Sequence, residues 1–212
     1  MSDVISAAAP LTRRESNKAD KLRRIEQAAR SLFLEKGYDE TTVREVASRA
    51  GVGFGTIFSY VTDKAELVYL IRNNEMEALL GEILPRARAA ANLEEQILTL
   101  TEAVFRLFRG QSQLSKIIRR ELTAHHDGIQ GKRFAETRGR ILSYFAECIS
   151  TAQASGAVRS AEEPELLAQT LFALMSFQLR RGEAEAEAGG IDAGLAYMNR
   201  MLRSVLSGWM RN

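Results

Sequence analysis

Apolar residues recur every three to four positions along almost the whole chain, which is the spacing of one buried face of an α-helix. No run alternates apolar and polar residues as a half-buried strand would. The pattern therefore predicts an all-α fold of about nine helices. They are expected over residues 18–36, 43–50, 54–60, 63–84, 92–110, 112–126, 133–155, 164–180 and 191–210. We expect Pro85 to end or kink the fourth, because proline lacks the helical N–H donor and clashes with the preceding turn.

The stretch from Thr42 to Lys64 predicts two short helices joined by a tight turn. Gly51 falls where the first would end in a left-handed residue, a conformation that glycine adopts without steric cost. A small residue at Ala47, a glycine at Gly51 and an apolar residue at Ile57 have the spacing of a helix-turn-helix. An ordinary helical hairpin within an all-α core is the alternative.

The second of these helices would expose a group of side chains to a partner. A helix of this kind fits the major groove of B-form DNA, where side chains can contact base edges. Thr42, followed three positions later by Glu45, predicts a capping box for the first helix, and such a helix N-terminus can also bind phosphate. The exposed residues of the second helix are expected to be Phe54, Thr56, Phe58 and Ser59.

Residues 20 to about 70 resemble the DNA-binding domain of the TetR family of bacterial transcription regulators. Two positions depart from the family pattern: Phe58 stands where tyrosine is usual, and Val61 where phenylalanine is usual. The first departure removes a hydroxyl that commonly reaches a phosphate. The residues that carry the resemblance are Phe33, Gly37, Tyr38, Thr41, Thr42, Val43, Ala47, Ala50, Gly51, Val52, Gly55, Thr56, Ile57, Tyr60, Lys64 and Leu67.

The resemblance implies a homodimeric, ligand-responsive repressor that binds a palindromic operator in double-stranded DNA. An effector that fits only a conformation with the wrong spacing of the two recognition helices would release the DNA. Arg44 is the best candidate for reading guanine, since its guanidinium can donate two hydrogen bonds to that base. Phosphate contacts are expected at Thr42, Tyr60 and Lys64, and base contacts at Arg44, Gly55 and Thr56, with Phe54, Phe58 and Ser59 beside them.

The chain is expected to divide into three parts. Residues 1–17 predict a disordered N-terminal arm, which is either a solvated tail or a basic arm in the minor groove through Arg13 and Arg14. Residues 18–65 would form the three-helix DNA-binding domain, and residues 66–212 an all-helical domain for effector binding and dimerisation. The apolar breadth of residues 166–179 and the apolar stripe of residues 191–209 predict a homodimer formed by the last two helices.

Aromatic and methionine side chains between residues 72 and 177 exceed what a minimal core needs, which favours a mostly apolar effector cavity. Core packing is the alternative for each of them. Polar contacts would come from His126, Gln178 or Arg119. The candidate lining residues are Phe105, Phe108, Leu122, His126, Tyr144, Phe145, Phe172 and Met175.

Composition and charge narrow the function classes. The formal net charge of +2 over 212 residues does not by itself indicate a nucleic-acid partner, but residues 13–30 hold seven basic and three acidic side chains. The single cysteine, Cys148, excludes an internal disulfide and is typical of a reducing cytoplasm. The longest uncharged run, residues 166–179, is shorter than the ~18 residues that a membrane span needs.

No nucleotide-binding, zinc-protease or paired-cysteine motif occurs in the sequence, so we expect no catalytic residue, no metal and no cofactor. His125 and His126 are adjacent on a predicted helix and point about 100° apart, which prevents them from gripping one metal ion together. The competing hypothesis is a helical ligand-binding protein whose helix-turn-helix is architectural or contacts another protein. The basic cluster beside the helix-turn-helix favours the DNA-binding interpretation.

Overall fold

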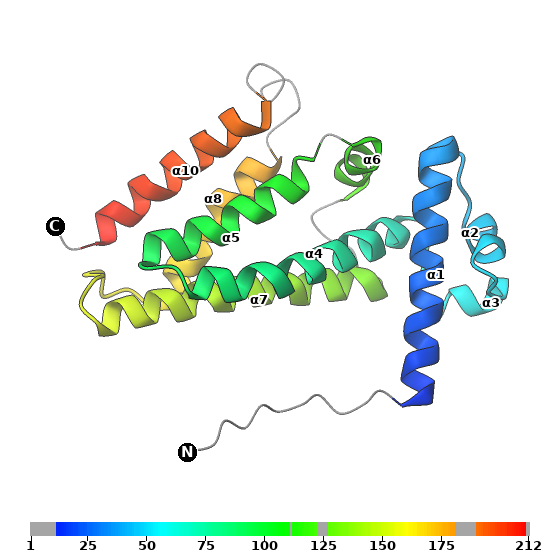
Figure 1. Ribbon diagram of the computed structural model, residues 1–212, viewed down its shortest axis with the longest axis horizontal. Helices are drawn as coiled ribbons and strands as arrows, with labels where there is room; N and C mark the ends of the chain where they lie inside the picture. Colours follow the sequence, from blue (N-terminus) through cyan, green and yellow to red (C-terminus); the bar gives the residue numbers. More distant parts are fainter. Residues whose placement is uncertain (1–11, 111, 123–126, 181–189, 211–212) are drawn as a thin grey trace.

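The computed structural model describes residues 12–110, 112–122, 127–180 and 190–210, which form helices and connecting turns without a strand. This confirms the all-α prediction. The helices in the described ranges are α1 (Arg13–Lys36), α2 (Val43–Arg49), α3 (Phe54–Ile57), α4 (Ala65–Arg88), α5 (Leu93–Phe108), α6 (Gln113–Glu121), α7 (Ile129–Ala154), α8 (Pro164–Arg180) and α10 (Gly190–Trp209) (Figure 1).

Helix α1 begins five residues earlier than the sequence predicted. Thr12 accepts a hydrogen bond from the Glu15 backbone N–H, and the Glu15 carboxylate accepts from the Thr12 backbone, so a capping box starts the helix at Arg13. The expected disordered arm was therefore wrong for residues 13–17, while its first eleven residues lie outside the described part of the chain. The missed signal is the Thr12-to-Glu15 spacing.

Two hydrophobic clusters divide the interior. The first joins α1, α2 and α3 to the first half of α4 and to α6; the second joins the rest of α4 to α5, α7, α8 and α10. Helix α4 supplies Leu67 and Ile71 to the first cluster and Met76 and Leu80 to the second, so it connects the two ends of the molecule. In Figure 1, α1 crosses the end of α4, which lies alongside α7.

Helix α4 continues through Pro85 to Arg88, so Pro85 does not end the helix, and a kink at Pro85 stays a prediction. The boundary expected at residue 65 stays a prediction, because α4 and α6 both contribute to the packing at the DNA-binding end. None of the helices in the described ranges is long and apolar enough to cross a membrane.

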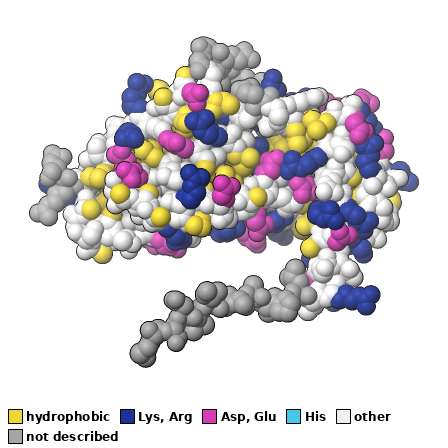
Figure 2. Space-filling view, in the orientation of Figure 1, with side chains coloured by type: hydrophobic (Ala, Val, Ile, Leu, Met, Phe, Trp, Pro, Cys, Tyr) yellow, Lys and Arg dark blue, Asp and Glu magenta, His cyan; other side chains and the backbone are white. Residues whose placement is uncertain are grey.

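The surface of the molecule carries both signs of charge. Figure 2 shows Lys and Arg side chains interspersed with Asp and Glu over most of the visible face. Many of them form ion pairs, such as Arg30 with Glu75 at 2.9 Å and Arg88 with Glu147 at 2.9 Å. The charge that could attract a ligand or DNA must therefore be sought in local groups.

Candidate DNA interface and effector cavity

The turn between α2 and α3 has the geometry that its sequence predicts. Gly51 has φ +62°, and the Val52 N–H donates to the Ala47 carbonyl at 3.0 Å, which closes the end of α2. The capping box of α2 is also present, with the Glu45 backbone N–H donating to the Thr42 hydroxyl at 3.3 Å. Helix α3 then begins directly after Gly53 and is shorter than expected, ending at Ile57 before a turn.

An exposed surface of one arginine and two aromatic rings lies on α2 and α3. The Arg44 guanidinium carbon is 4.3 Å from the centroid of the Phe54 ring, and the Phe54 and Phe58 rings meet edge to face with centroids 5.3 Å apart. Both rings are 42% exposed. Gly55, Thr56 and Ser59 are exposed beside them. We call Arg44, Phe54 and Phe58, with these three neighbours, the reading surface.

The three residues expected to hold phosphates are differently placed. Thr42 donates its hydroxyl to Glu45 at 2.7 Å, so it serves the helix cap. Tyr60 is only 8% exposed and packs in the first cluster. The Lys64 ammonium donates to the Tyr38 and Asp39 carbonyls at 3.1 and 3.0 Å. Their phosphate contacts therefore stay predictions, and each side chain also supports the fold.

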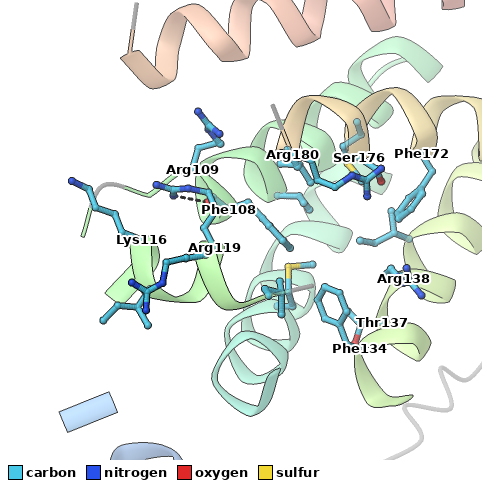
Figure 3. Close-up of a pocket in the computed structure, with 18 of the residues that line it drawn as sticks. Phe108, Arg109, Lys116, Arg119, Phe134, Thr137, Arg138, Phe172, Ser176 and Arg180 are labelled. Carbon is cyan, nitrogen blue, oxygen red and sulfur yellow. Dashed lines mark hydrogen bonds between the residues drawn. The ribbon is translucent and has the colours of Figure 1, made fainter. Parts of the chain in front are cut away.

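A cavity of about 760 Å³ lies between α4, α5, α6, α7 and α8, within the range of about 300–1,000 Å³ that is typical of small-molecule sites. Its apolar wall includes Met76, Val104, Phe134, Ile141, Phe172 and Met175. Figure 3 shows side chains from α5 and α6, among them Phe108 and Lys116, on one side of the cavity and side chains from α7, among them Phe134, on the other.

Four of the predicted lining residues reach the cavity: Phe108, Leu122, Phe172 and Met175. Phe105, Tyr144 and Phe145 do not line it; they are buried and pack in the second cluster. The sequence interpretation was wrong for these three, and core packing, the alternative, holds. His126 lies outside the described residues. Ligand contact remains a prediction for the four that line the cavity.

The cavity also has polar lining that sequence reasoning largely missed. Arg119 lines the cavity as expected. Gln178, which was also expected there, does not line it and donates to the Met201 sulfur at 3.0 Å. The missed cations are Arg109, Lys116, Arg120, Arg138 and Arg180. The signal in the sequence is a basic residue within one helical turn of apolar residues, as Arg138 is between Phe134 and Ile141.

The comparisons with known proteins agree with this architecture. Residues 25–69 match the family described as bacterial regulatory proteins, tetR family. An HTH-type transcriptional regulator of Mycobacterium bovis is 25% identical over 161 residues, which cover 76% of this chain and 82% of that protein. The DNA-binding domain of this chain belongs to the TetR family. The chain is a DNA-binding transcriptional regulator.

Solved structures of this family have the same fold. A TetR-family regulator from Pectobacterium atrosepticum has a TM-score of 0.67 at 17% identity, covering 95% of this chain and 99% of that chain. FadR from Bacillus subtilis, solved in complex with stearoyl-CoA, has a TM-score of 0.66 at 19% identity, covering 88% and 98%. The TetR architecture thus extends over the helices around the cavity as well as over the helix-turn-helix.

A buried carboxylate connects the helix-turn-helix of this TetR chain to α7. Glu66, which is fully buried, accepts hydrogen bonds from the backbone N–H groups of Gln130 and Gly131 at 2.7 and 2.8 Å, in the first turn of α7. A negative charge is stabilised at such a helix N-terminus. The Gln130 side chain in turn donates to the Tyr60 carbonyl at 2.9 Å. Helix α7 is therefore fixed directly to the end of the recognition segment.

A second connection runs from the cavity wall to α1. The guanidinium carbon of Arg72, which is 1% exposed, lies 4.5 Å from the centroid of the Phe108 ring. Arg72 pairs with Glu75 at 3.2 Å, and Glu75 pairs with Arg30 of α1 at 2.9 Å. Since Phe108 lines the cavity, these contacts connect the cavity wall to α1.

Proposed function

We propose that this TetR-family regulator is a homodimeric repressor that a small, mostly apolar molecule releases from its operator. The reading surface of α2 and α3 is the observation that carries the DNA-binding part of this proposal. The Arg44 guanidinium lies over the Phe54 ring and remains exposed. Because the side chain is already ordered, it loses little conformational entropy when it enters a major groove. Arg44 then donates to a guanine, while Phe54 and Phe58 make apolar contacts such as those with thymine methyl groups.

The dimer forms through the outer faces of α8 and α10. Leu166 and Phe177 are 49% and 57% exposed and lie three turns apart on one side of α8, with Tyr197 of α10 41% exposed. The apolar stripe of α10 was expected to serve the dimer, but Leu202 is fully buried in its own subunit's core. The outer side of α8 is therefore the better basis for association, because exposed large apolar residues favour an interface.

The effector occupies the cavity, and α6 passes the signal to the DNA-binding end. Leu114 and Ile118 of α6 pack in the first cluster with the helix-turn-helix, while Ile117 both contacts that cluster and lines the cavity beside Lys116. A ligand that favours another position of α6 therefore changes the packing beneath α1. FadR from Bacillus subtilis was solved in the same fold with stearoyl-CoA, which carries a long apolar acyl chain, and this is in keeping with a mostly apolar effector here.

The DNA-binding part is tested by titrating promoter DNA next to the protein's own gene, and a scrambled duplex, at several salt concentrations. Arg44→Ala should cost about 1–3 kcal/mol on the operator and much less on the scrambled duplex. Arg49→Ala is the matched control, since Arg49 is an exposed arginine of the same helix that pairs with Glu35 at 2.5 Å. Equal losses on both duplexes for Arg44→Ala would show that Arg44 holds a phosphate instead.

Lys64→Ala should weaken both duplexes nearly alike and lower the salt dependence of log K by about one per subunit. The Lys64 ammonium also donates to two backbone carbonyls. The unfolding free energy of the Lys64→Ala variant must therefore be measured as well as its affinity for DNA. Phe58→Tyr, which adds a hydroxyl at an exposed position, should strengthen binding to both duplexes. An unchanged salt slope for Lys64→Ala would remove this residue from the interface.

The dimer is tested by sedimentation of Phe177→Glu at micromolar concentration. Phe177 is mostly exposed, so the substitution should leave the fold intact and shift the protein toward monomer. Leu34→Glu, at a residue of α1 that is 47% exposed, is the control and should remain dimeric. A wild-type chain that sediments as a monomer, or a dimeric Phe177→Glu variant, would contradict this interface.

A further inference from the structure

The charged residues on the cavity wall are all of one sign. Six of the described lining residues are Lys or Arg, and none of the described ones is Asp or Glu. Arg109, Arg119, Arg120 and Arg180 lie at helix C-termini, where the helix dipole favours basic residues in any protein. That reason does not extend to Arg138, far inside α7, or to Lys116, in the first half of α6. The helix dipole therefore does not account for all of the positive charge on the cavity wall.

The wall changes from apolar to cationic in one direction. Along α8 it passes from Phe172 and Met175 to Arg180 at the end of the helix, and along α5 it passes from Val104 to Arg109. Figure 3 shows Arg109, Lys116 and Arg119 gathered on the side of the cavity toward α6, away from Phe172. Arg138 departs from this direction, because its guanidinium carbon lies 5.9 Å from the Phe134 ring centroid on the α7 side (Figure 3). The cavity thus has a more cationic end toward α6 and a mostly apolar end that holds Arg138.

Burial decides which cations matter most for a ligand. Arg109 is 8% exposed, and Arg119 is half-buried, with its guanidinium held in place by hydrogen bonds to the Phe108 and Gly110 carbonyls at 3.2 and 3.3 Å. Lys116 and Arg180 are exposed, so water and salt screen them more strongly. Arg120 is already paired with Asp39 at 3.1 Å and with Glu121 at 2.5 Å.

We propose that the effector is an amphipathic anion whose apolar chain lies between α7 and α8 and whose carboxylate or phosphate head is held by Arg109, Arg119 and Arg180. This rests on the proposed function, in which the cavity is the effector site. Planar guanidinium groups bind carboxylates and phosphates with two parallel hydrogen bonds, so these three arginines suit a carboxylate or phosphate head.

The charges behind the wall support this assignment. Burial lowers the pKa of Arg72 to about 10, and although Glu75 opposes that change, the nearby positive charges of Arg30 and Arg119 add to it. The positive field of Arg119 therefore extends past Phe108 into the interior. A bound anion would offset that field, and it would link α6 to the end of α8 while the opposite side of α6 stays packed on the DNA-binding end.

The test compares four compounds with one alkyl chain and different heads: decanoate, decyl phosphate, decanol and decyltrimethylammonium. Calorimetric titration of the full chain measures binding, and fluorescence anisotropy of the labelled promoter duplex measures release. One or both of the anions should bind at least about tenfold more tightly than decanol, and the cation more weakly than decanol. The difference between decanoate and decyl phosphate identifies which head the site prefers.

Arg180→Gln, at an exposed position that carries little folding risk, should reduce anion affinity about tenfold and leave decanol affinity unchanged. Arg109→Gln should do the same with a larger loss, because Arg109 is more buried. Arg140→Gln is the matched control: Arg140 is exposed on α7 and does not line the cavity. Raising the salt concentration should weaken the better anion but not decanol.

Decanol binding as tightly as both anions, or the cation binding best, would overturn the anion assignment, while release of DNA by those compounds would leave the proposed function standing. Anion binding that needs Arg180 but does not change DNA affinity would support the site and contradict the proposed regulation. Failure of all four compounds to bind would overturn the assignment as well.

Discussion

Around α1, α2 and α3 the buried apolar side chains close on one another, whereas between α5, α7 and α8 they surround a cavity of about 760 Å³. Both ends are built from amphipathic helices with similar apolar residues. This difference in packing matches the different functions proposed for the two ends. A closed core fixes the backbone beneath the reading surface, while an open one leaves contacts unmade until a ligand supplies them, which lets binding shift the stability of one conformation.

The comparison is tested most strongly by the same substitution at both ends. Phe33→Ala should lower the unfolding free energy by about 3–5 kcal/mol, because Phe33 is fully buried in the first cluster. Phe172→Ala should cost well under half as much, since one side of its ring already faces the cavity. Urea denaturation at one fixed protein concentration measures both. Similar losses would show that the cavity is filled or closed in solution.

Glu66→Ala tests the connection between the two ends. It leaves the Gln130 and Gly131 backbone N–H groups without their buried acceptor, which should cost about 1–3 kcal/mol. Glu77→Ala is the matched control: Glu77 is on the same helix and also contacts α7, through Arg133, but it is mostly exposed, so its loss should stay below about 1 kcal/mol. Equal costs at the two sites in thermal and urea unfolding would contradict the importance of burial here.

Gly51→Ala should destabilise the protein by about 1–2 kcal/mol, because the left-handed conformation brings an added Cβ into conflict with its own backbone. The new Cβ would also lie 3.2 Å from the Arg24 guanidinium. Gly81→Ala, in the middle of α4 with open space around its Cβ, should instead stabilise by about 0.5–1 kcal/mol. The two melting temperatures should therefore move in opposite directions, and a shared direction would argue against the turn geometry.

Lowering the pH should destabilise the DNA-binding end by protonating its carboxylates. This is the smallest of the expected effects. Hydrogen bonds from Lys36 and then Thr42 lower the pKa of Glu45 to about 2, below its ordinary value of 4.5. Because the folded-state pKa is the lower one, the stability that Glu45 contributes is complete above pH 4.5 and is lost as the pH falls toward 2. The stability gap between wild type and Glu45→Gln should shrink across that window. A gap independent of pH would rule out this contribution.

Local features at both ends of the molecule could be predicted from the sequence alone. The capping box at Thr42 and Glu45, the left-handed Gly51 and the extent of α8 from Pro164 to Arg180 all appear as expected. These features depend on residues within a few positions of one another, so local spacing and backbone sterics are enough to determine them. The start of α1 at Arg13 was equally local and was missed only because the Thr12 cap was not considered.

Tertiary structure alone decided which buried residues face the cavity and which charges meet. Phe105 and Phe108 are three positions apart on one helix, yet the first is packed in the core and the second lines the cavity. Periodicity reveals which side of a helix is buried, but not whether a neighbouring helix or an empty space lies against it. The convergence of Arg109, Arg119 and Arg180 likewise required three helices to be placed in space, because charges far apart in sequence attract the same ligand only once the packing has brought them together.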